Sequence, residues 1–393
     1  MIKQKTVVKV NPQIIKWTRS SGGWEINELA KKLNIDADTI HKWESKEQSI
    51  EIKKLEQLAD CVKRPLAVFF LKNPPIESEL TDFRKLSGSE TGELCKKTLV
   101  SIRETKYLQS IAAELLKNQK LSLEPEIMSF TLADDPERIA IAERIKLGFE
   151  SESKLLSKHS LKSINNFYST LRKIIESFNI FIFQTSMPVE EARGFTISNT
   201  FPRVIVVNSS DTYQARIFTL LHEYGHLLLK KDGICLAEPV LLKTKRSIDQ
   251  IQKIERWCNI FAASVLMPRQ DFLAQLRSLE HHYDDYTKII SYLSAHFKTS
   301  KKATIVRILN ISPTTSIPNY EYYEKMYYAP EKKTKKKKSS GGPNAIDIVI
   351  SRKGRKFVSL VVDSKEKKIV NTSDVINYLR INQKHVDKLQ EKL

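Results

Sequence analysis

The sequence lacks any apolar run long enough to cross a membrane. Of its 393 residues, 41% are hydrophobic and 28% are charged, which is the balance of a globular protein in water. The N-terminal residues also lack the apolar stretch, followed by small residues, that marks a signal peptide. We therefore expect a protein of the cytoplasm that does not enter a membrane.

Cysteine is scarce, and no two cysteines form a CxxC pair. The four are Cys61, Cys95, Cys235 and Cys258. Such scattering argues against a thiolate zinc cluster and against a disulfide framework. We expect four reduced thiols.

The charge is strongly one-sided, with a formal net charge of +19. Part of this excess lies in the lysine-rich run at 331–338. Blocks of like charge are typical of solvated spacers, so we assign the run to a basic flexible linker at 313–342. Net charge alone therefore does not establish nucleic-acid binding.

The first 78 residues show the pattern of a helix-turn-helix domain. Asn11-Pro12 offers an N-cap followed by proline at the first helical position. A second helix is expected at about 27–33, and Asp36 can cap a third helix. Apolar residues from Ile50 to Ala59 predict a fourth helix that closes the core.

The third helix of this domain could contact DNA. The candidate contacts are Thr39, His41, Lys42, Ser45 and Lys46, with Lys31 and Lys32 near phosphate. Asp36 and Asp38, however, place negative charge at the front of the helix, where base contacts are usually made. DNA binding and protein docking therefore stay as equal alternatives.

The rest of the chain mixes helices with short strands. We expect a helical connector at 79–150, then strands at 178–183, 194–197 and 204–207. After the linker, the alternating isoleucines at 346–350 and the apolar run at 357–362 predict two strands, followed by helical sequence.

The pentapeptide at 222–226 reads His-Glu-Tyr-Gly-His. On a helix, His222 and His226 lie on one face and can bind one metal ion. Glu223 lies beside that face and can act as a general base on water. Gly225 allows a neighbouring backbone to approach closely.

Two histidines alone do not establish a metal site, so a third protein ligand is needed. The metzincin continuation would need glycine at 229 and histidine at 232, where the chain has Leu229 and Asp232. Glu255, 29 residues after His226, is the better candidate, on a helix expected at 247–267. Asn259 follows one turn later, and its amide can hydrogen-bond to the ring nitrogen of a ligand histidine that faces away from the metal.

Three runs of sequence resemble the ImmA/IrrE family of metallo-endopeptidases. They lie at 218–226, 255–263 and 266–268, and the segments at 193–195 and 202–208 resemble the family's upstream strands. The family commonly has alanine where this chain has Cys258, and a polar or acidic residue where it has Trp257.

The resemblance implies a Zn²⁺ ion held by His222, His226 and Glu255, with Glu223 as the base. It also implies an Xre-type helix-turn-helix before the peptidase and a strand-and-helix tail after it. The predicted fold class is α+β multidomain, with an all-α domain at 1–78, a zincin-like core at 151–312 and a small strand-helix module at 343–393.

The function implied by the resemblance is cleavage of a helix-turn-helix repressor, which derepresses stress-response, phage or mobile-element genes. The alternative is a DNA-binding regulator or antitoxin-like partner protein with a mainly structural or conditionally active metal site. A dimer stays open. The donor that stabilises the oxyanion also stays open among Tyr213, Arg216, His281, His282 and Tyr283.

Overall fold

The structure is a computed structural model. It describes residues 6–46, 48–62, 64, 66–74, 95–122, 124–149, 163–231, 233–235, 250–283, 285–311 and 344–393. The predicted linker at 313–342 lies outside these ranges. The chain forms two compact units: Met1–Ser110 with Ser186–Pro188, and Ile111–Thr185 with Val189–Leu393. No described helix is long and apolar enough to cross a membrane.

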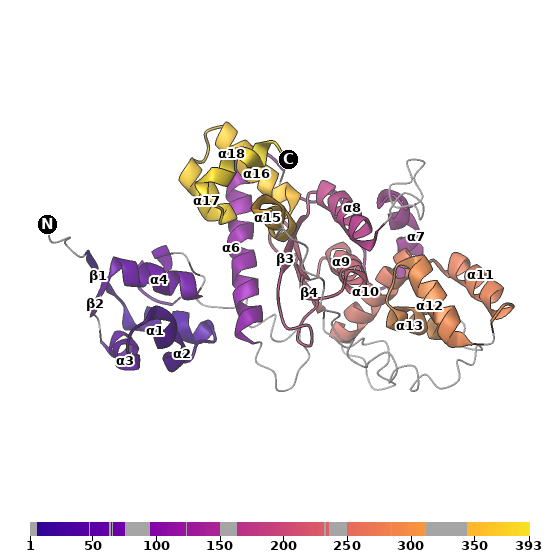
Figure 1. Cartoon of the computed structure of the whole chain (residues 1–393), viewed down its shortest axis with the longest axis horizontal. Helices are drawn as coiled ribbons and strands as arrows, with labels where there is room; N and C mark the ends of the chain where they lie inside the picture. The colour runs from indigo at the N-terminus through magenta and orange to yellow at the C-terminus, as the bar shows by residue number, and fades with distance from the viewer. Residues whose placement is uncertain are drawn as a thin grey trace. The chain divides into compact units, whose positions relative to one another are not determined.

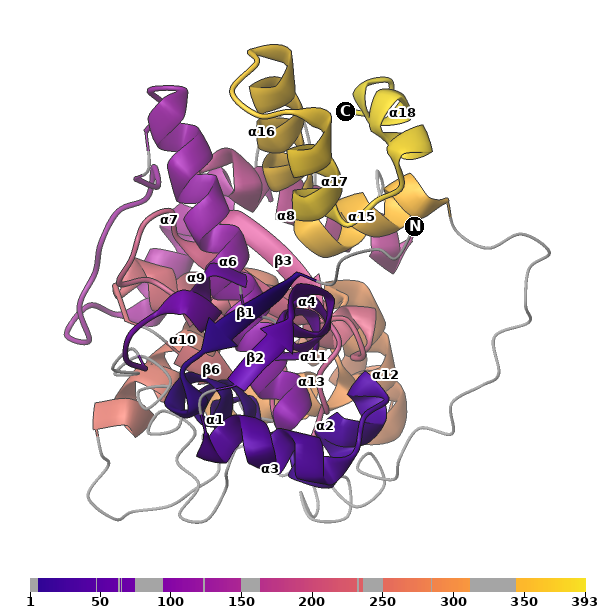
Figure 2. The same ribbon diagram turned by 90° about the vertical axis from the view of Figure 1, so that its left-hand side faces the viewer.

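The first unit is a small helical domain (Figure 2). Its helices are α1 (Pro12–Ser21), α2 (Ile26–Leu33), α3 (Ala37–Ser45), α4 (Ile52–Val62) and the 3₁₀ helix η1 (Leu66–Phe70). Asn11 caps α1 as expected, because its side chain accepts a hydrogen bond from the Gln13 amide at 2.9 Å. Asn34, at φ 54°, ends α2 in the left-handed region.

Two details of this unit differ from the sequence prediction. Residues 48–51 form β2 (Gln48–Glu51), which pairs antiparallel with β1 (Val7–Val10), so Ile50 lies in a strand. Asp36 does precede α3, but its side chain makes no capping hydrogen bond. The two short strands were missed because a four-residue run carries too little periodicity.

Helix α6 (Lys96–Asn118) runs across the boundary between the two units, and α7 (Pro136–Lys146) belongs to the second. Both lie where a helical connector was expected. Asp135 caps α7 by accepting a hydrogen bond from the Glu137 amide at 2.9 Å.

A four-stranded sheet organises the second unit (Figure 1). The strands are β3 (Phe181–Thr185), β4 (Gly194–Ile197), β5 (Val204–Asn208) and β6 (Gly233–Cys235), in the order β3-β5-β4-β6. β3 and β5 are parallel, while β4 is antiparallel to both of its neighbours. The first three strands were predicted and β6 was not.

Helices cover this sheet and extend the core beyond it. α8 (Ile164–Ser177) packs against β3, and α9 (Tyr213–Leu228) packs on β4 and β5. α10 (Gln250–Leu266) lies against α9 and α7. They are followed by α11 (Arg269–Glu280), α12 (Tyr286–Phe297) and α13 (Lys301–Ile311). One apolar core joins the sheet to these helices.

The C-terminal module is helical, so the two strands expected there are wrong. It contains α15 (Ala345–Lys353), α16 (Arg355–Glu366), α17 (Thr372–Leu379), η3 (Gln383–His385) and α18 (Val386–Gln390). Periodicity cannot separate a short strand from a buried helix turn. Here Ile346, Val349 and Lys353 are buried at helical spacing.

This module packs directly on the edge strand β3. The Phe357 ring lies edge-on to Phe181 and Phe183, at centroid distances of 6.4 and 5.6 Å. Gly354 joins α15 to α16 at φ 79°. A Cβ there would lie 2.5 Å from Glu176 Oε1 and 2.7 Å from the Ile182 carbonyl oxygen, so only glycine fits.

Candidate metal centre

Helix α9 carries both histidines of the pentapeptide on one face. Thr212 caps the helix by accepting a hydrogen bond from the Ala215 amide at 3.4 Å. His222 and His226 are both buried, and their ring centroids lie 5.0 Å apart. Apolar residues on either side anchor the helix in the core, so the two imidazoles are held in fixed positions.

Glu255 on α10 meets both histidines. Its Oε2 lies 3.1 Å from His222 Nε2 and its Oε1 lies 3.2 Å from His226 Nε2. The two Nε2 atoms are 3.2 Å apart. Among the described residues, this is the only group of three or more potential ligands whose ligand atoms all lie within 4.8 Å of one another.

These distances fit a bound metal ion. Tetrahedral ligands at the bond lengths usual for zinc would lie roughly 3.3 Å from one another. The observed separations of 3.1 to 3.2 Å are close to that edge length. Two imidazoles and a carboxylate also form a donor set that zinc accepts, and three protein ligands leave one position open.

Asn259 contacts one of the two histidines, as its position one turn after Glu255 predicts. Its Oδ1 lies 3.0 Å from His222 Nδ1. An amide oxygen only accepts hydrogen bonds, so Nδ1 carries the hydrogen and Nε2 keeps a lone pair for a metal.

The two neighbouring histidines keep the Glu255 carboxyl ionised. Burial opposes ionisation of Glu255, but the adjacent His226 and His222 outweigh it and lower the pKa of this carboxyl. Glu255 is therefore anionic near neutral pH, which is the form that binds a cation.

Glu223 is fully buried and held in one orientation. Its Oε2 accepts a hydrogen bond from Thr196 Oγ1 at 2.7 Å, and its Oε1 has no hydrogen-bond partner among the described residues. Burial raises the pKa of this carboxyl, against the opposing effect of His226 and His222. A carboxylate with a raised pKa is a better proton acceptor. Thr196 was not expected from the sequence.

Two glycines bring the site's elements together. A Cβ at Gly194 on β4 would lie 2.6 Å from Thr219 Cγ2 and 2.7 Å from the Val206 carbonyl oxygen. A Cβ at Gly225 on α9 would lie 3.3 Å from Cys258 Sγ and 3.4 Å from its Cα. The close approach expected at Gly225 is confirmed, and α9 is held between β4 and α10.

Two parts of the chain match models of known protein families. Residues 175–309 match a peptidase family model described as the IrrE N-terminal-like domain, and residues 15–69 match one described as helix-turn-helix. This part of the chain is therefore similar to the IrrE-type peptidase domain. The resemblance found in the sequence, together with its helix-turn-helix, is thereby confirmed. No curated protein matches the chain.

In the IrrE-like domain, α10 packs tightly although Trp257 and Cys258 depart from the family pattern. Trp257 stacks on Phe261 at 5.5 Å and donates from Nε1 to the Asp134 carbonyl oxygen at 2.8 Å. Cys258 is fully buried. The indole thus takes part in packing between α10 and the segment before α7.

A buried polar pair on the other side of α9 was also missed. Tyr224 donates from its hydroxyl to Glu143 Oε2 at 2.7 Å, and Lys146 pairs with the other oxygen of Glu143 at 2.7 Å. No motif marks such a pair, because its partners come from helices far apart in sequence. It fixes the rotation of α9 about its axis.

The five candidate oxyanion donors are not gathered at the cluster by any described contact. Arg216 donates to the Asp211 carbonyl oxygen at 2.9 Å and to Gln184 Oε1 at 3.3 Å. His282 Nδ1 lies 2.6 Å from the Ser278 carbonyl oxygen. Tyr213 and Arg216 line a separate cavity.

The candidate DNA contacts lie on or beside α3, in the first unit. His41, Lys42, Ser45 and Lys46 are exposed, and Thr39 is half-buried. Asp36 and Asp38 are exposed at the start of the same helix. The surface therefore presents both signs of charge.

Proposed function

We propose that the chain is a zinc-dependent endopeptidase, with His222, His226 and Glu255 as metal ligands and Glu223 as general base. The observation that carries this proposal is the convergence of three ligand atoms at 3.1 to 3.2 Å beside a buried, oriented carboxylate. A purely structural zinc site would use four protein ligands and would need no such carboxylate.

The chain's own residues divide the chemistry between them. When bound, zinc acts as a Lewis acid on the scissile carbonyl and makes water a stronger nucleophile. Glu223 accepts a proton from the attacking water at its unpartnered Oε1 and delivers it to the leaving amine. Thr196 holds the opposite oxygen, so this carboxylate does not rotate away. Asn259 keeps His222 in the ligand tautomer.

The sheet offers a place for an extended substrate. β6 is an outer strand of the sheet, paired to β4, which carries Thr196. The other outer strand, β3, is covered by α15. A peptide that adds to the sheet by backbone hydrogen bonds would therefore lie on the β6 side, near the metal cluster.

For the substrate we propose a helix-turn-helix repressor, whose cleavage derepresses stress-response, phage or mobile-element genes. The family resemblance and the accompanying helix-turn-helix domain support this choice. Such a substrate implies action in the cytoplasm.

A second candidate is a DNA-binding regulator or antitoxin-like partner protein whose metal site is structural or acts only on command. The exposed basic residues of α3 favour it. A gel-shift titration across salt concentration tests it, because true phosphate contacts weaken as salt rises. A shift that does not depend on salt would exclude phosphate-mediated binding.

The deciding experiment is cleavage of a purified helix-turn-helix repressor encoded beside this protein's gene. The full chain is loaded with Zn²⁺ and compared with Glu223→Gln, which keeps the shape of the side chain and removes the base. Zinc content is measured for both. We expect both to hold zinc and only the wild type to cleave. Equal cleavage by both would refute the role of Glu223.

A further inference from the structure

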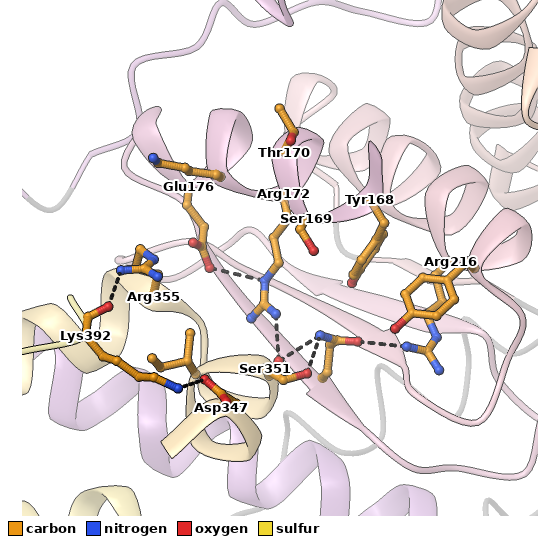
Figure 3. A pocket seen from close by; sticks show the side chains of 14 residues that line it. Tyr168, Ser169, Thr170, Arg172, Glu176, Arg216, Asp347, Ser351, Arg355 and Lys392 are labelled. Carbon is orange, nitrogen blue, oxygen red and sulfur yellow. Dashed lines mark hydrogen bonds and ion pairs between the residues drawn. The ribbon is translucent and has the colours of Figure 1, made fainter. Parts of the chain in front are cut away.

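A cavity of about 620 Å³ lies between α8 and α15 (Figure 3), and none of the proposed metal ligands lines it. The end of β3 and the first turn of α9 complete its walls. It lies wholly within the second unit. No motif in the sequence marked it, because its lining comes from segments more than 100 residues apart.

The lining is rich in positive charge. The lining includes five cationic and two anionic side chains. The cations are Arg172, Lys173, Arg216, Arg355 and Lys392, and the anions are Glu176 and Asp347. Such an excess favours an anionic occupant.

Hydrogen bonds between its own residues hold the walls in place, as the dashed lines in Figure 3 show. Arg172 donates to the Ser351 carbonyl oxygen at 2.6 Å and pairs with Glu176 at 3.3 Å. Gln184 donates to the same carbonyl oxygen at 2.7 Å and accepts from Arg216 at 3.3 Å. These bonds tie α8, β3, α9 and α15 together, so the cavity is preorganised.

One buried group in this frame lacks a partner. Tyr168 is only 3% exposed, and its hydroxyl makes no hydrogen bond with any described residue. Figure 3 shows the side chain pointing from α8 towards the cavity that it lines. Buried hydroxyls are almost always hydrogen-bonded. Burial raises the pKa of Tyr168 to about 12, so the hydroxyl keeps its proton and can donate it to an acceptor.

Two of the cations that line the cavity can still donate further hydrogen bonds. Lys173 is exposed, and no described residue pairs with it. Each terminal nitrogen of the Arg216 guanidinium carries two N–H groups and uses one, for the Ser209 carbonyl oxygen and for Gln184 Oε1. An acceptor in the cavity could take the remaining N–H groups.

We propose that this cavity binds a small molecule that carries a phosphate group. Phosphate offers three strong acceptor oxygens and more than one negative charge, which suits a tyrosine hydroxyl, a guanidinium and a lysine together. A cavity of about 620 Å³ is far larger than a bare phosphate and falls in the range of small-molecule sites. The occupant therefore has an organic part.

The test is binding by the full chain, measured by titration calorimetry and by thermal unfolding. The probes are glucose 6-phosphate, adenosine 5′-monophosphate and inorganic phosphate, with glucose and adenosine as unphosphorylated controls. We expect saturable binding of at least one organic phosphate and none of its unphosphorylated control. Absence of saturable binding by every phosphate probe would overturn the proposal.

Two variants locate the binding. Tyr168→Phe removes only the unpartnered hydroxyl, so we expect about tenfold weaker binding with no loss of thermal stability without ligand. Lys173→Glu reverses an exposed charge and should also weaken binding. Tyr292→Phe, which alters an exposed tyrosine on α12, is the control. Unchanged affinity in both cavity variants would refute this site, and none of these readouts depends on peptidase activity.

Discussion

The metal cluster and the helix-turn-helix domain both match known families, but they differ in how far the structure specifies their chemistry. At the cluster, every functional group except the slightly exposed Glu255 is buried, and most have a defined partner. On α3, the candidate contacts are exposed and lie beside Asp36 and Asp38.

Burial accounts for this difference. A buried polar group that lacks a hydrogen-bond partner destabilises the fold. The partners of the groups in a buried site can therefore be identified from the structure, and they indicate what each group does. An exposed side chain forms its hydrogen bonds with water, so its contacts in the structure do not indicate which ligand it binds. The function of α3 therefore has to be measured, whereas the role of Glu255 can be argued from distances.

The largest effect is expected when one of the proposed metal ligands is removed from the cluster. Glu255→Gln loses the only anionic ligand and should weaken zinc binding by more than about 100-fold, measured by competition with a chromophoric chelator. Glu280→Gln, on the exposed face of α11, is the matched control. If Glu255→Gln bound zinc as tightly as the wild type, the proposed ligand set would be wrong.

Substitution of Asn259 should have a smaller effect, because Asn259 would act on a bound metal only through its hydrogen bond with His222. Asn259→Ala removes the acceptor for His222 Nδ1, and we expect zinc affinity to fall about 10- to 100-fold. Asn259→Asp keeps an acceptor oxygen and should retain more of the affinity. The same chelator competition measures both. Equal losses in the two variants would show that the hydrogen bond is not what matters.

Packing at Gly194 gives a test that does not involve the metal. An added Cβ would lie 2.7 Å from a backbone carbonyl oxygen, which cannot move without shifting β5. Gly194→Ala should therefore lower the free energy of unfolding by about 1 to 3 kcal/mol, measured by urea denaturation of the zinc-free protein. A variant as stable as the wild type would show that β4 and α9 can separate.

The smallest effects are expected in the helix-turn-helix domain. Asn11→Ala removes a real cap and should cost about 1 kcal/mol. Asp36→Ala removes a side chain that makes no capping bond, and should change stability by less than about 0.5 kcal/mol. Thermal unfolding compares the two. A larger loss at Asp36 would mean that its charge stabilises α3.

Asp36 and Asp38 also offer a way to learn what α3 binds. If α3 lies on DNA, Asp36→Asn with Asp38→Asn should strengthen DNA binding in a gel shift, because two negative charges are removed from the phosphate side. If α3 docks on a protein, DNA binding should stay weak in both forms.

Local patterns predicted those parts of the fold that depend on local sequence. The spacing of His222 and His226, the strands predicted at 194–197 and 204–207, and the Asn11 cap each depend on only a few neighbouring residues. Glu255 and Asn259 could be found because they share one helix turn. Their roles remain predictions, although the distances agree with them.

What the sequence could not predict depends on contacts between distant segments. Thr196 reaches Glu223 only because β4 lies beneath α9. The C-terminal helices were read as strands because short apolar runs are ambiguous until their partner surface is known. The surroundings of Tyr168, whose hydroxyl lacks a hydrogen-bond partner among the described residues, likewise come from segments far apart in the sequence.

The contact at Gly354 has a consequence for how this chain could change over evolution. The backbone at this glycine presses against Glu176 and Ile182, and Phe357 covers two phenylalanines of β3. A shortened chain that ended before residue 344 would expose this apolar edge and uncover the pair formed by Arg172 and Glu176. The tail therefore cannot be exchanged as a free module: any replacement would have to bring its own cover for β3.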